Sequence, residues 1–179
     1  MINKVTVIGS GLMGAGIAAH LTNAGINVLL LDIPDKNSKN RNELADQAVK
    51  KLSKIKPSPL TLNKNTKLIQ TGNTEDDFEL INDTDWVIEA IIEDINIKKS
   101  LYEKIQKTMK KNLMISSNTS TIPLSKLIEG RSKKFVSNFF ITHFFNPPRY
   151  LKLLEIVSSK DSNSKFKNIL CEFCDFKLG

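Results

Sequence analysis

One glycine-rich stretch decides the fold: Gly9-Ser10-Gly11-Leu12-Met13-Gly14. It follows Val5 to Ile8, a run typical of a strand buried on both faces, and it precedes the helix-like run Ala15 to Leu21. Its first glycine permits a tight turn, the second lets the backbone approach a pyrophosphate, and the third lets the helix pack closely on the sheet. Free N–H groups at the helix start then hold the anion. The stretch therefore predicts a dinucleotide-binding turn, and the alternative is a glycine-rich turn without a ligand.

An acidic residue stands where such a site needs one. Asp32 ends the next strand-like run, Val28 to Leu31, 18 residues beyond Gly14. A carboxylate there accepts hydrogen bonds from the adenosine ribose and repels a 2′-phosphate. The position favours NAD over NADP, unless Lys36 or Lys39 offsets the repulsion.

Strand-like and helix-like segments alternate along the rest of the chain. Helices are predicted from about Arg41 to Lys54 and over Asn96 to Met109, the second with Ile97, Leu101, Ile105 and Met109 on one face and lysines on the outer face. Further strands are predicted at residues 67–70, 86–90, 113–117, 139–143 and 151–157. This alternation predicts the α/β class, with a Rossmann-type doubly wound, mostly parallel sheet in one domain over residues 1–179.

Composition limits the partners. The 179 residues carry a formal charge of +7, from 26 Lys and Arg against 19 Asp and Glu. This charge suits phosphate-bearing small molecules. The sequence has no basic stripe interleaved with aromatic residues, so it does not favour nucleic-acid binding. No apolar stretch is long enough to cross a bilayer and the N-terminus does not have the layout of a signal peptide, so we expect a soluble, cytoplasmic protein without a membrane partner.

The two cysteines form a C-x-x-C pair, Cys171 and Cys174. Such a pair can be a redox or metal site. The helix-like run around it favours two small side chains packed on one helix face instead. We therefore expect no metal site.

Polar residues that suit acid–base chemistry lie in the second half. Ser116 to Thr121 follow a predicted strand, at the edge where doubly wound sheets bind ligands. His143 and Glu155 are symmetric about Arg149, so a chain that folds back there pairs them across an antiparallel edge of the sheet, with Cβ atoms about 5 Å apart. The carboxylate fixes the imidazole tautomer and stabilises its charged form. The pair is an acid–base candidate, and the alternative is a structural hydrogen bond on an edge hairpin.

Together these segments resemble the NAD-binding domain of L-3-hydroxyacyl-CoA dehydrogenases, most closely the bacterial fatty-acid β-oxidation type. The resemblance spans nearly the whole chain and includes Val87 to Glu93 and Ser116 to Ser120. Its specific part is His143 to Pro147, with Lys152 and Glu155 at the family spacing.

The resemblance implies hydride transfer between C3 of a 3-hydroxyacyl-CoA and the nicotinamide of NAD. It implies that His143 takes the hydroxyl proton, that Glu155 orients His143, and that Ser120 binds the substrate oxygen. Glu93 and Lys98 match positions beside the nicotinamide-side ribose, and Asn146 matches one near the nicotinamide. The cofactor-binding residues so implied are Gly9, Ser10, Gly11, Leu12, Met13, Gly14, Asp32, Glu93, Lys98, Ser120 and Asn146. The resemblance also implies that coenzyme A meets lysines of one helix, namely Lys50, Lys51, Lys54 and Lys56. The alternative is that these lysines only form a solvated helix face.

The family also has a C-terminal helical domain, which we expect to be absent because the chain stops at Gly179. There are three alternatives for such a chain: a fragment of a longer protein, a chain that works with a separately encoded C-terminal domain, or an inactive NAD-binding remnant. Apolar surface left uncovered would favour self-association. Three substrate classes are also alternatives: longer 3-hydroxyacyl-CoA, 3-hydroxybutyryl-CoA, and hydroxy acids without coenzyme A. Tyr150 and Leu151 favour the first.

Overall fold

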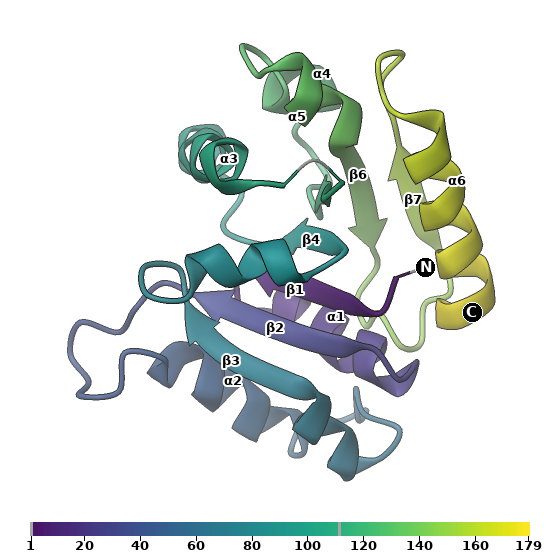
Figure 1. Ribbon diagram of the computed structural model, residues 1–179. Coiled ribbons are helices and arrows are strands. Elements are labelled where there is room, and N and C mark those ends of the chain that lie inside the picture. The colour runs from purple at the N-terminus through teal and green to yellow at the C-terminus, as the bar shows by residue number, and fades with distance from the viewer. Residues whose placement is uncertain (1, 111) are drawn as a thin grey trace.

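The structure, a computed structural model, describes residues 2–110 and 112–179 (Figure 1). Its strands are β1 (Lys4–Ile8), β2 (Asn27–Asp32), β3 (Ile69–Asn73), β4 (Trp86–Glu89), β5 (Met114–Ser117), β6 (Phe139–Phe144) and β7 (Leu154–Val157). Its α-helices are α1 (Leu12–Asn23), α2 (Glu43–Leu52), α3 (Ile95–Thr108), α4 (Leu124–Leu127), α5 (Lys133–Asn138) and α6 (Ser164–Phe173). Shorter helical turns are η1 (Asn63–Leu68), η2 (Phe78–Asp83) and η3 (Cys174–Leu178).

The strands form one seven-stranded sheet in the order β3-β2-β1-β4-β5-β6-β7. Every neighbouring pair is parallel except β6 and β7, which are antiparallel. The predicted α/β doubly wound sheet with an antiparallel edge is confirmed. Because six strands run in parallel, their carboxyl ends meet at one edge of the sheet, which is where such sheets bind ligands.

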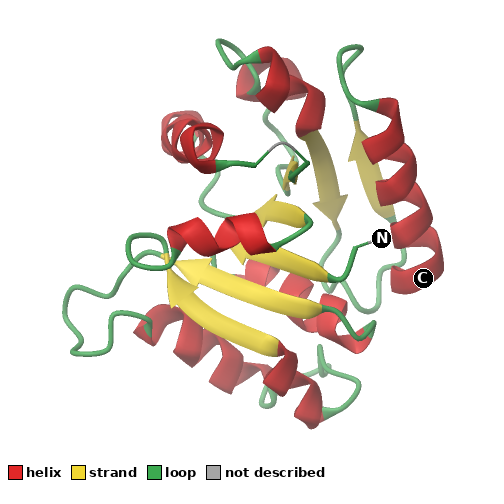
Figure 2. Cartoon of the chain, viewed as in Figure 1, coloured by secondary structure: helices red, strands yellow, loops and turns green. Residues whose placement is uncertain are grey.

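Helices lie on both faces of the sheet (Figure 2). Along β2, Val28 and Leu30 belong to the core that α1, α2 and α6 cover, whereas Leu29 and Leu31 belong to the core under α3, α4 and α5. This alternation explains the continuous apolar runs, because both sides of each inner strand are buried. Trp86 is fully buried between the sheet and α6, and its ring meets that of Phe173 edge-on at 6.2 Å between centroids.

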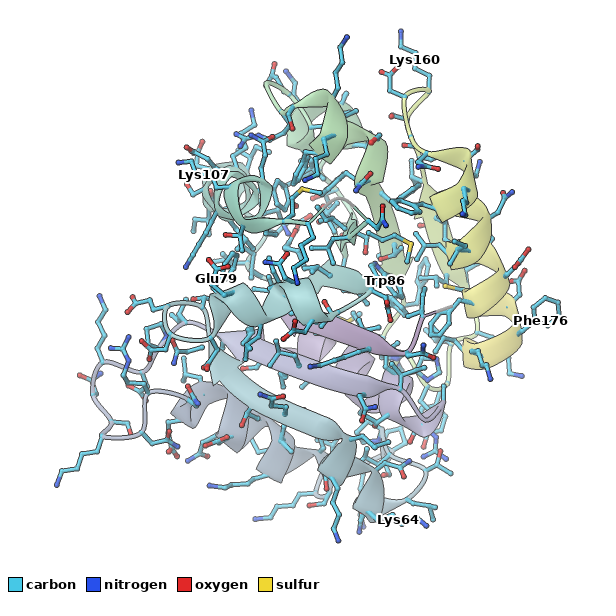
Figure 3. The ribbon with its side chains drawn as sticks, in the orientation of Figure 1. Lys64, Glu79, Trp86, Lys107, Lys160 and Phe176 are labelled. Atoms are coloured by element: carbon cyan, nitrogen blue, oxygen red, sulfur yellow. The ribbon has the colours of Figure 1, made fainter. Side chains whose placement is uncertain are left out.

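Surface side chains contrast with this core in Figure 3. There the labelled Lys64, Lys107 and Lys160 point outward, and Phe176 projects from η3 with 84% of its surface exposed. Further exposed apolar residues lie between β6 and β7 or on β7 itself: Tyr150, Leu151, Leu153 and Val157.

The structure corrects two predicted strand boundaries and one predicted helix face. The strand predicted at residues 67–70 is Ile69–Asn73, because the preceding residues form η1. The last strand begins at Leu154 rather than 151, since the chain turns at Pro147, whose carbonyl accepts bonds from the N–H groups of Tyr150 and Leu151. The amphipathic helix exists as α3, and Ile105 and Met109 of the predicted apolar face are buried. Ile97 of that face is instead 48% exposed, and Lys98 and Tyr102 are buried.

Cys174 packs in the core and Cys171 is half-buried beside it, and both are free thiols. Burial raises the pKa of the Cys174 thiol to about 12. Within residues 2–110 and 112–179, no group of three or more His, Cys, Asp or Glu side chains is arranged to hold a metal ion. None of the helices in that same part of the chain has the length and apolar character needed to cross a membrane.

Candidate active site

The glycine-rich turn joins β1 to α1. Gly9 has φ of +101°, and a Cβ there would lie 2.6 Å from the carbonyl oxygen of Ala90. A Cβ on Gly14 would lie 1.8 Å from the carbonyl oxygen of Gly9. Around Gly11, by contrast, a Cβ would meet nothing within 4 Å. Two glycines therefore close the turn and the third leaves open space over it, as a passing pyrophosphate requires.

The start of α1 is suited to an anion. Gly11 is the N-cap and gives no side-chain hydrogen bond, and the first turn carries no acidic residue. The first backbone N–H groups of a helix have no partner within the helix. Together with the positive end of the helix dipole, they form a phosphate-binding site.

Asp32 lies beside this turn at the end of β2. Its Oδ2 accepts hydrogen bonds from the backbone N–H of Ser10 at 2.6 Å and from the Ser10 hydroxyl. Its Oδ1 accepts the N–H of Ile33 at 2.7 Å. Lys36 and Lys39 are exposed, and neither forms an ion pair with Asp32 in the described structure. The carboxylate is thus held at the rim of the turn with its charge uncompensated by those lysines.

An apolar pocket adjoins Asp32 on the α3 side of the sheet. Apolar side chains from the ends of β1, β2 and β4 and from α3 line it: Ile8, Ile33, Ile91, Ile97 and Leu101. Thr74, Ser100 and Lys104 complete its wall. A flat, weakly polar ring fits between such walls.

His143 and Glu155 face each other across β6 and β7. They are register partners, and the His143 Nδ1 lies 2.8 Å from the Glu155 Oε2. The chain does fold back as an antiparallel pair, which was the condition under which the sequence placed the two residues opposite each other. The Phe145 ring packs against the imidazole at 4.4 Å between centroids. Because Nδ1 is engaged, Nε2 is the ring nitrogen available to exchange a proton with a ligand.

The segment that follows His143 is fastened to distant parts of the chain. Pro148 lies against Gly16 of α1, where a Cβ would approach its Cδ to 3.3 Å. Arg149 donates from Nη1 to the carbonyl oxygens of Ser58 and Leu60, both at 2.8 Å, and the Tyr150 hydroxyl donates to Ser58 at 2.9 Å. These bonds tie the His143 hairpin to the loop that follows α2.

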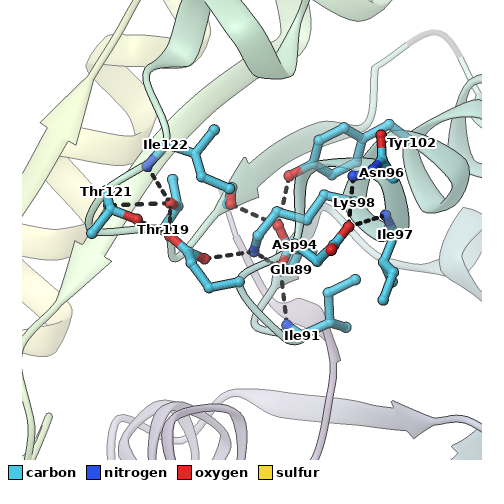
Figure 4. A network of polar contacts seen from close by, with 12 residues as sticks. Glu89, Ile91, Asp94, Asn96, Ile97, Lys98, Tyr102, Thr119, Thr121 and Ile122 are labelled. Carbon is cyan, nitrogen blue, oxygen red and sulfur yellow. Dashed lines mark hydrogen bonds and ion pairs between the residues drawn. The ribbon is translucent and has the colours of Figure 1, made fainter.

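A buried carboxylate that the sequence analysis did not assign to the site organises its centre (Figure 4). Glu89, at the end of β4, is fully buried. Its Oε1 accepts from Lys98 Nζ at 2.6 Å and from the N–H of Ile91 at 2.9 Å. Its Oε2 accepts from the hydroxyls of Tyr102 and Ser117, each at 2.6 Å. Four donors, from the loop after β4, from α3 and from β5, therefore satisfy one carboxylate.

Lys98 joins this buried carboxylate to a second one at the surface. Its Nζ also lies 3.2 Å from the Glu93 Oε2, and its side chain is 1% exposed against 38% for Glu93. Glu93 Oε1 accepts bonds from the hydroxyls of Thr119 and Thr121. Partial burial alone would raise the pKa of Glu93, but these hydroxyls and the charge of Lys98 outweigh it and hold that pKa below its ordinary value.

The remaining predicted residues differ in how the structure places them. Ser120 follows β5 and Asn146 follows β6, both exposed after the carboxyl ends of their strands. Lys50, Lys54 and Lys56 are exposed on or after α2. Lys51 alone among the predicted lysines lines the large pocket beside the glycine turn, with Ser10, Leu12 and Gln47 among its neighbours there. The sheet thus brings the glycine turn, Asp32, Glu93, Ser120 and His143 to one edge.

A doubly wound sheet with a glycine turn after β1 and an acidic residue at the end of β2 is typical of a dinucleotide-binding domain of the oxidoreductase type. Comparison with known proteins narrows this class. Residues 4–177 match the family model described as 3-hydroxyacyl-CoA dehydrogenase, NAD binding domain. The chain belongs to the 3-hydroxyacyl-CoA dehydrogenase family, whose members are NAD-dependent oxidoreductases.

Individual relatives agree with the family match. A probable 3-hydroxyacyl-CoA dehydrogenase of Deinococcus radiodurans is 47% identical over 99% of this chain and 51% of its own length. A putative fatty acid oxidation complex trifunctional enzyme of Rickettsia felis is 49% identical over 94% of this chain and 23% of its own. The crystal structure of 3-hydroxybutyryl-CoA dehydrogenase from Escherichia coli K12 superposes with a TM-score of 0.80 at 28% identity, over 97% of this chain and 36% of the other. The chain thus spans between about a quarter and about half of the length of these relatives.

Proposed function

We propose that this chain is the cofactor-binding part of an enzyme that oxidises L-3-hydroxyacyl-CoA to 3-oxoacyl-CoA with NAD in fatty-acid β-oxidation. The observation that carries the proposal is the hydrogen-bonded pair of His143 and Glu155 at the edge of the sheet that also holds the glycine turn. Relatives whose names include fatty acid oxidation support the pathway.

The residues at this edge fit NAD from end to end. Asp32 accepts hydrogen bonds from the adenosine ribose hydroxyls and disfavours a 2′-phosphate. The apolar pocket beside it takes the adenine ring, and the open space over Gly11 takes the pyrophosphate. Glu93 and Ser120 lie farther along the edge, beyond β4 and β5, where the nicotinamide-side ribose reaches. When bound, NAD supplies the acceptor for the hydride.

His143 serves as the acid–base group. As the hydride leaves C3 of the substrate, Nε2 accepts the proton of the C3 hydroxyl, so that a carbonyl forms there. Glu155 holds Nδ1 and stabilises the imidazolium that results. Ser120 donates a hydrogen bond to the substrate oxygen, and Asn146 lies near the nicotinamide.

The coenzyme A part of the substrate carries phosphates, which basic side chains on and after α2 attract. The exposed lysines of this segment are Lys50, Lys51, Lys54 and Lys56. A solvated helix face is the alternative for them. The fastening of Arg149 to Ser58 and Leu60 favours the substrate role, because it links this lysine-rich segment to the hairpin that carries His143.

The test is acetoacetyl-CoA-dependent oxidation of NADH by the purified chain, with His143→Ala beside it and NADH binding measured separately for both. A rate that His143→Ala abolishes, while NADH binding is retained, supports the proposal. No rate in a chain that binds NADH identifies a cofactor-binding unit that needs a separately supplied C-terminal dehydrogenase domain or a second copy. Adding such a domain from a relative would then restore the rate. No NADH binding in a folded chain contradicts the proposal.

A further inference from the structure

The loop that follows Asp32 carries an arginine, Arg41, which two carboxylates of the loop after β3 hold in place. Its Nε donates to the Asp76 Oδ2 at 2.6 Å. Its Nη2 donates to the Asp76 Oδ1 at 3.2 Å and to the Glu75 Oε2 at 2.6 Å. The guanidinium therefore spends three charge-assisted hydrogen bonds on protein carboxylates. The bond from Arg41, followed by one from Asn73, holds the pKa of Asp76 below its ordinary value.

A buried asparagine fixes the loop that carries these carboxylates. Asn73, the last residue of β3, is 1% exposed. Its Oδ1 accepts the N–H groups of Glu75 and Asp76, at 3.0 and 2.8 Å. Its Nδ2 donates to the Asp76 Oδ2 at 2.9 Å and to the Oδ1 of Asn42, the neighbour of Arg41, at 2.7 Å. The ion pairs thus belong to a network that joins both loops, whereas an isolated surface ion pair would hold little.

This network lies beside the acid that we expect to meet the adenosine ribose. Asp32 and Asn73 are register partners at the carboxyl ends of β2 and β3, and the Thr74 N–H donates to the Asp32 carbonyl oxygen at 2.8 Å. A hollow between the two loops is lined by residues of both, with Thr74 and Glu75 on the β3 side. In NADP-binding domains of this architecture, an arginine near the acid accommodates the 2′-phosphate. Arg41 is an arginine in that neighbourhood, but its donors are already engaged.

We propose that Glu75 and Asp76 are positioning residues for cofactor preference, which favour NAD by holding Arg41 away from the 2′-phosphate of NADP. The inference rests on the proposed function, in which Asp32 meets the adenosine ribose. Arg41 is the only arginine in residues 33–42, and its side chain is 48% exposed, so a phosphate can reach it once the carboxylates release it. A guanidinium binds phosphate through two parallel hydrogen bonds, which the lysines of the same loop cannot form.

Amide variants release Arg41 with little change of shape. Glu75→Gln combined with Asp76→Asn keeps both side-chain lengths but removes both charges, so that a phosphate competes for the guanidinium. The readout is the ratio of the NADPH and NADH Kd values, measured by fluorescence on one preparation. We expect this ratio to shift toward NADPH by about ten-fold, the low end of what a hydrogen bond to a charged group contributes. A merely structural role would weaken both dinucleotides alike, and an unchanged ratio would overturn the inference.

A third substitution decides whether the effect passes through Arg41. Adding Arg41→Met to the amide variant should abolish the shift toward NADPH. A shift that persists would mean that the two carboxylates repel the phosphate directly, and would overturn the inference. If the paired variant does not fold, Glu75→Gln alone replaces it and should give a smaller shift in the same direction, which Arg41→Met again abolishes.

The matched control removes two other surface carboxylates. Asp83→Asn combined with Glu103→Gln alters the net charge equally, and these residues form ion pairs with Lys110 and Lys107. This control should leave the ratio of the two Kd values as it is. A shift as large as that of the amide variant would assign the effect to net charge alone and contradict the role of Arg41.

A further measurement does not depend on cofactor binding. We expect the Arg41 Nε–H to exchange slowly with water in the NMR spectrum of the unmodified chain and faster when Glu75→Gln and Asp76→Asn are combined. Equally fast exchange in both would show that the carboxylates do not hold the guanidinium. If the unmodified chain binds no NADH, the proposed function fails, and this exchange rate still decides whether Arg41 is held.

Discussion

The His143 Nδ1 lies 2.8 Å from the Glu155 Oε2 because the two residues are opposed partners in the only antiparallel strand pair of the described sheet. The backbone register, and not a flexible loop, therefore aligns the imidazole with its carboxylate. A side chain placed by two paired strands has little freedom to turn away.

Changes to this pair should affect turnover and leave cofactor binding alone. We expect His143→Ala to lower the acetoacetyl-CoA-dependent rate by roughly 100- to 10,000-fold, the usual contribution of a general acid–base group. Glu155→Gln should lower it less, because an amide oxygen can still hold Nδ1. Steady-state rates and NADH affinities, measured on the same preparations, check both. A weakened NADH affinity in either variant would point to a structural role instead.

Two glycines of one turn should respond to alanine in opposite ways. Gly14→Ala places a Cβ against the carbonyl oxygen of Gly9 and should destabilise the fold by at least about 3 kcal/mol. Gly11→Ala meets no protein atom within 4 Å, so its Tm should be unchanged while NADH binding weakens. Thermal unfolding and binding assays on the two variants check this. Normal NADH affinity in Gly11→Ala would mean that the pyrophosphate does not cross the turn.

The preference between the two nicotinamide dinucleotides should depend on Asp32. Asp32→Asn keeps an oxygen that can accept from Ser10 but removes the charge that repels a 2′-phosphate. We expect the ratio of the NADPH and NADH Kd values to shift toward NADPH by about ten-fold, equivalent to about 1.4 kcal/mol. Asp35→Asn, in the loop that follows β2, is the matched control and should leave the ratio as it is. An unchanged ratio in the Asp32 variant would contradict the assignment.

The bonds from Arg149 to Ser58 and Leu60 should be needed for a stable loop after α2. Arg149→Met removes two charge-assisted hydrogen bonds, while the hydroxyls of Tyr150 and Ser58 still donate to the same two carbonyl oxygens, so the loss should cost about 1–3 kcal/mol of unfolding free energy. Hydrogen exchange should show earlier labelling of residues 56–62. Arg41→Met, which removes exposed ion pairs with Glu75 and Asp76, should have a smaller effect. Equal protection of residues 56–62 from hydrogen exchange in both variants would show that the Arg149 hydrogen bonds do not hold this loop.

Acid stability should depend in part on Thr71 and Asp46. The Thr71 hydroxyl donates to the Asp46 Oδ1 at 2.5 Å, and this bond, followed by one from Asn40, lowers the pKa of Asp46 below 3.8. A depressed folded-state pKa stabilises the fold above the ordinary value and stops doing so as the pH falls through the folded-state value. The Tm difference between the unmodified chain and Thr71→Val should therefore be largest above about pH 4 and shrink below it. A constant difference down to pH 2 would rule out this carboxyl as the cause.

Much of the fold followed from patterns that act over short distances. The glycine turn and the apolar runs predicted the parallel sheet, because strands buried on both faces need continuous apolar sequence. The symmetry of His143 and Glu155 about Arg149 predicted their contact, since an antiparallel hairpin fixes its own register. The edge strand β3 was misplaced because Thr71, Gly72 and Asn73 carry little of the apolar signal that marks an inner strand.

The sequence analysis missed the hydrogen-bond network around Glu89 because its members are far apart in the sequence. Lys98 reads as an outer-face lysine of an amphipathic helix, and only tertiary structure supplies the carboxylate beneath it. A signal did exist. Lys98, Tyr102 and Ile105 share one helix face at spacings of four and three, and Glu89 places an acid at the end of an otherwise apolar strand. An acid and a base that both fall on buried positions predict each other, because neither is stable there alone.

The strand order also has a consequence for how the chain is made. β1 lies inside the sheet, with Thr6 between Leu29 of β2 and Val87 of β4, so one of its neighbours is synthesised almost at once and the other about sixty residues later. Until β4 leaves the ribosome, β1 presents an open, apolar edge of unpaired backbone groups. Translation that stalls between β3 and β4 would expose this edge, and nascent chains halted there should be those that chaperones bind most and that aggregate most readily.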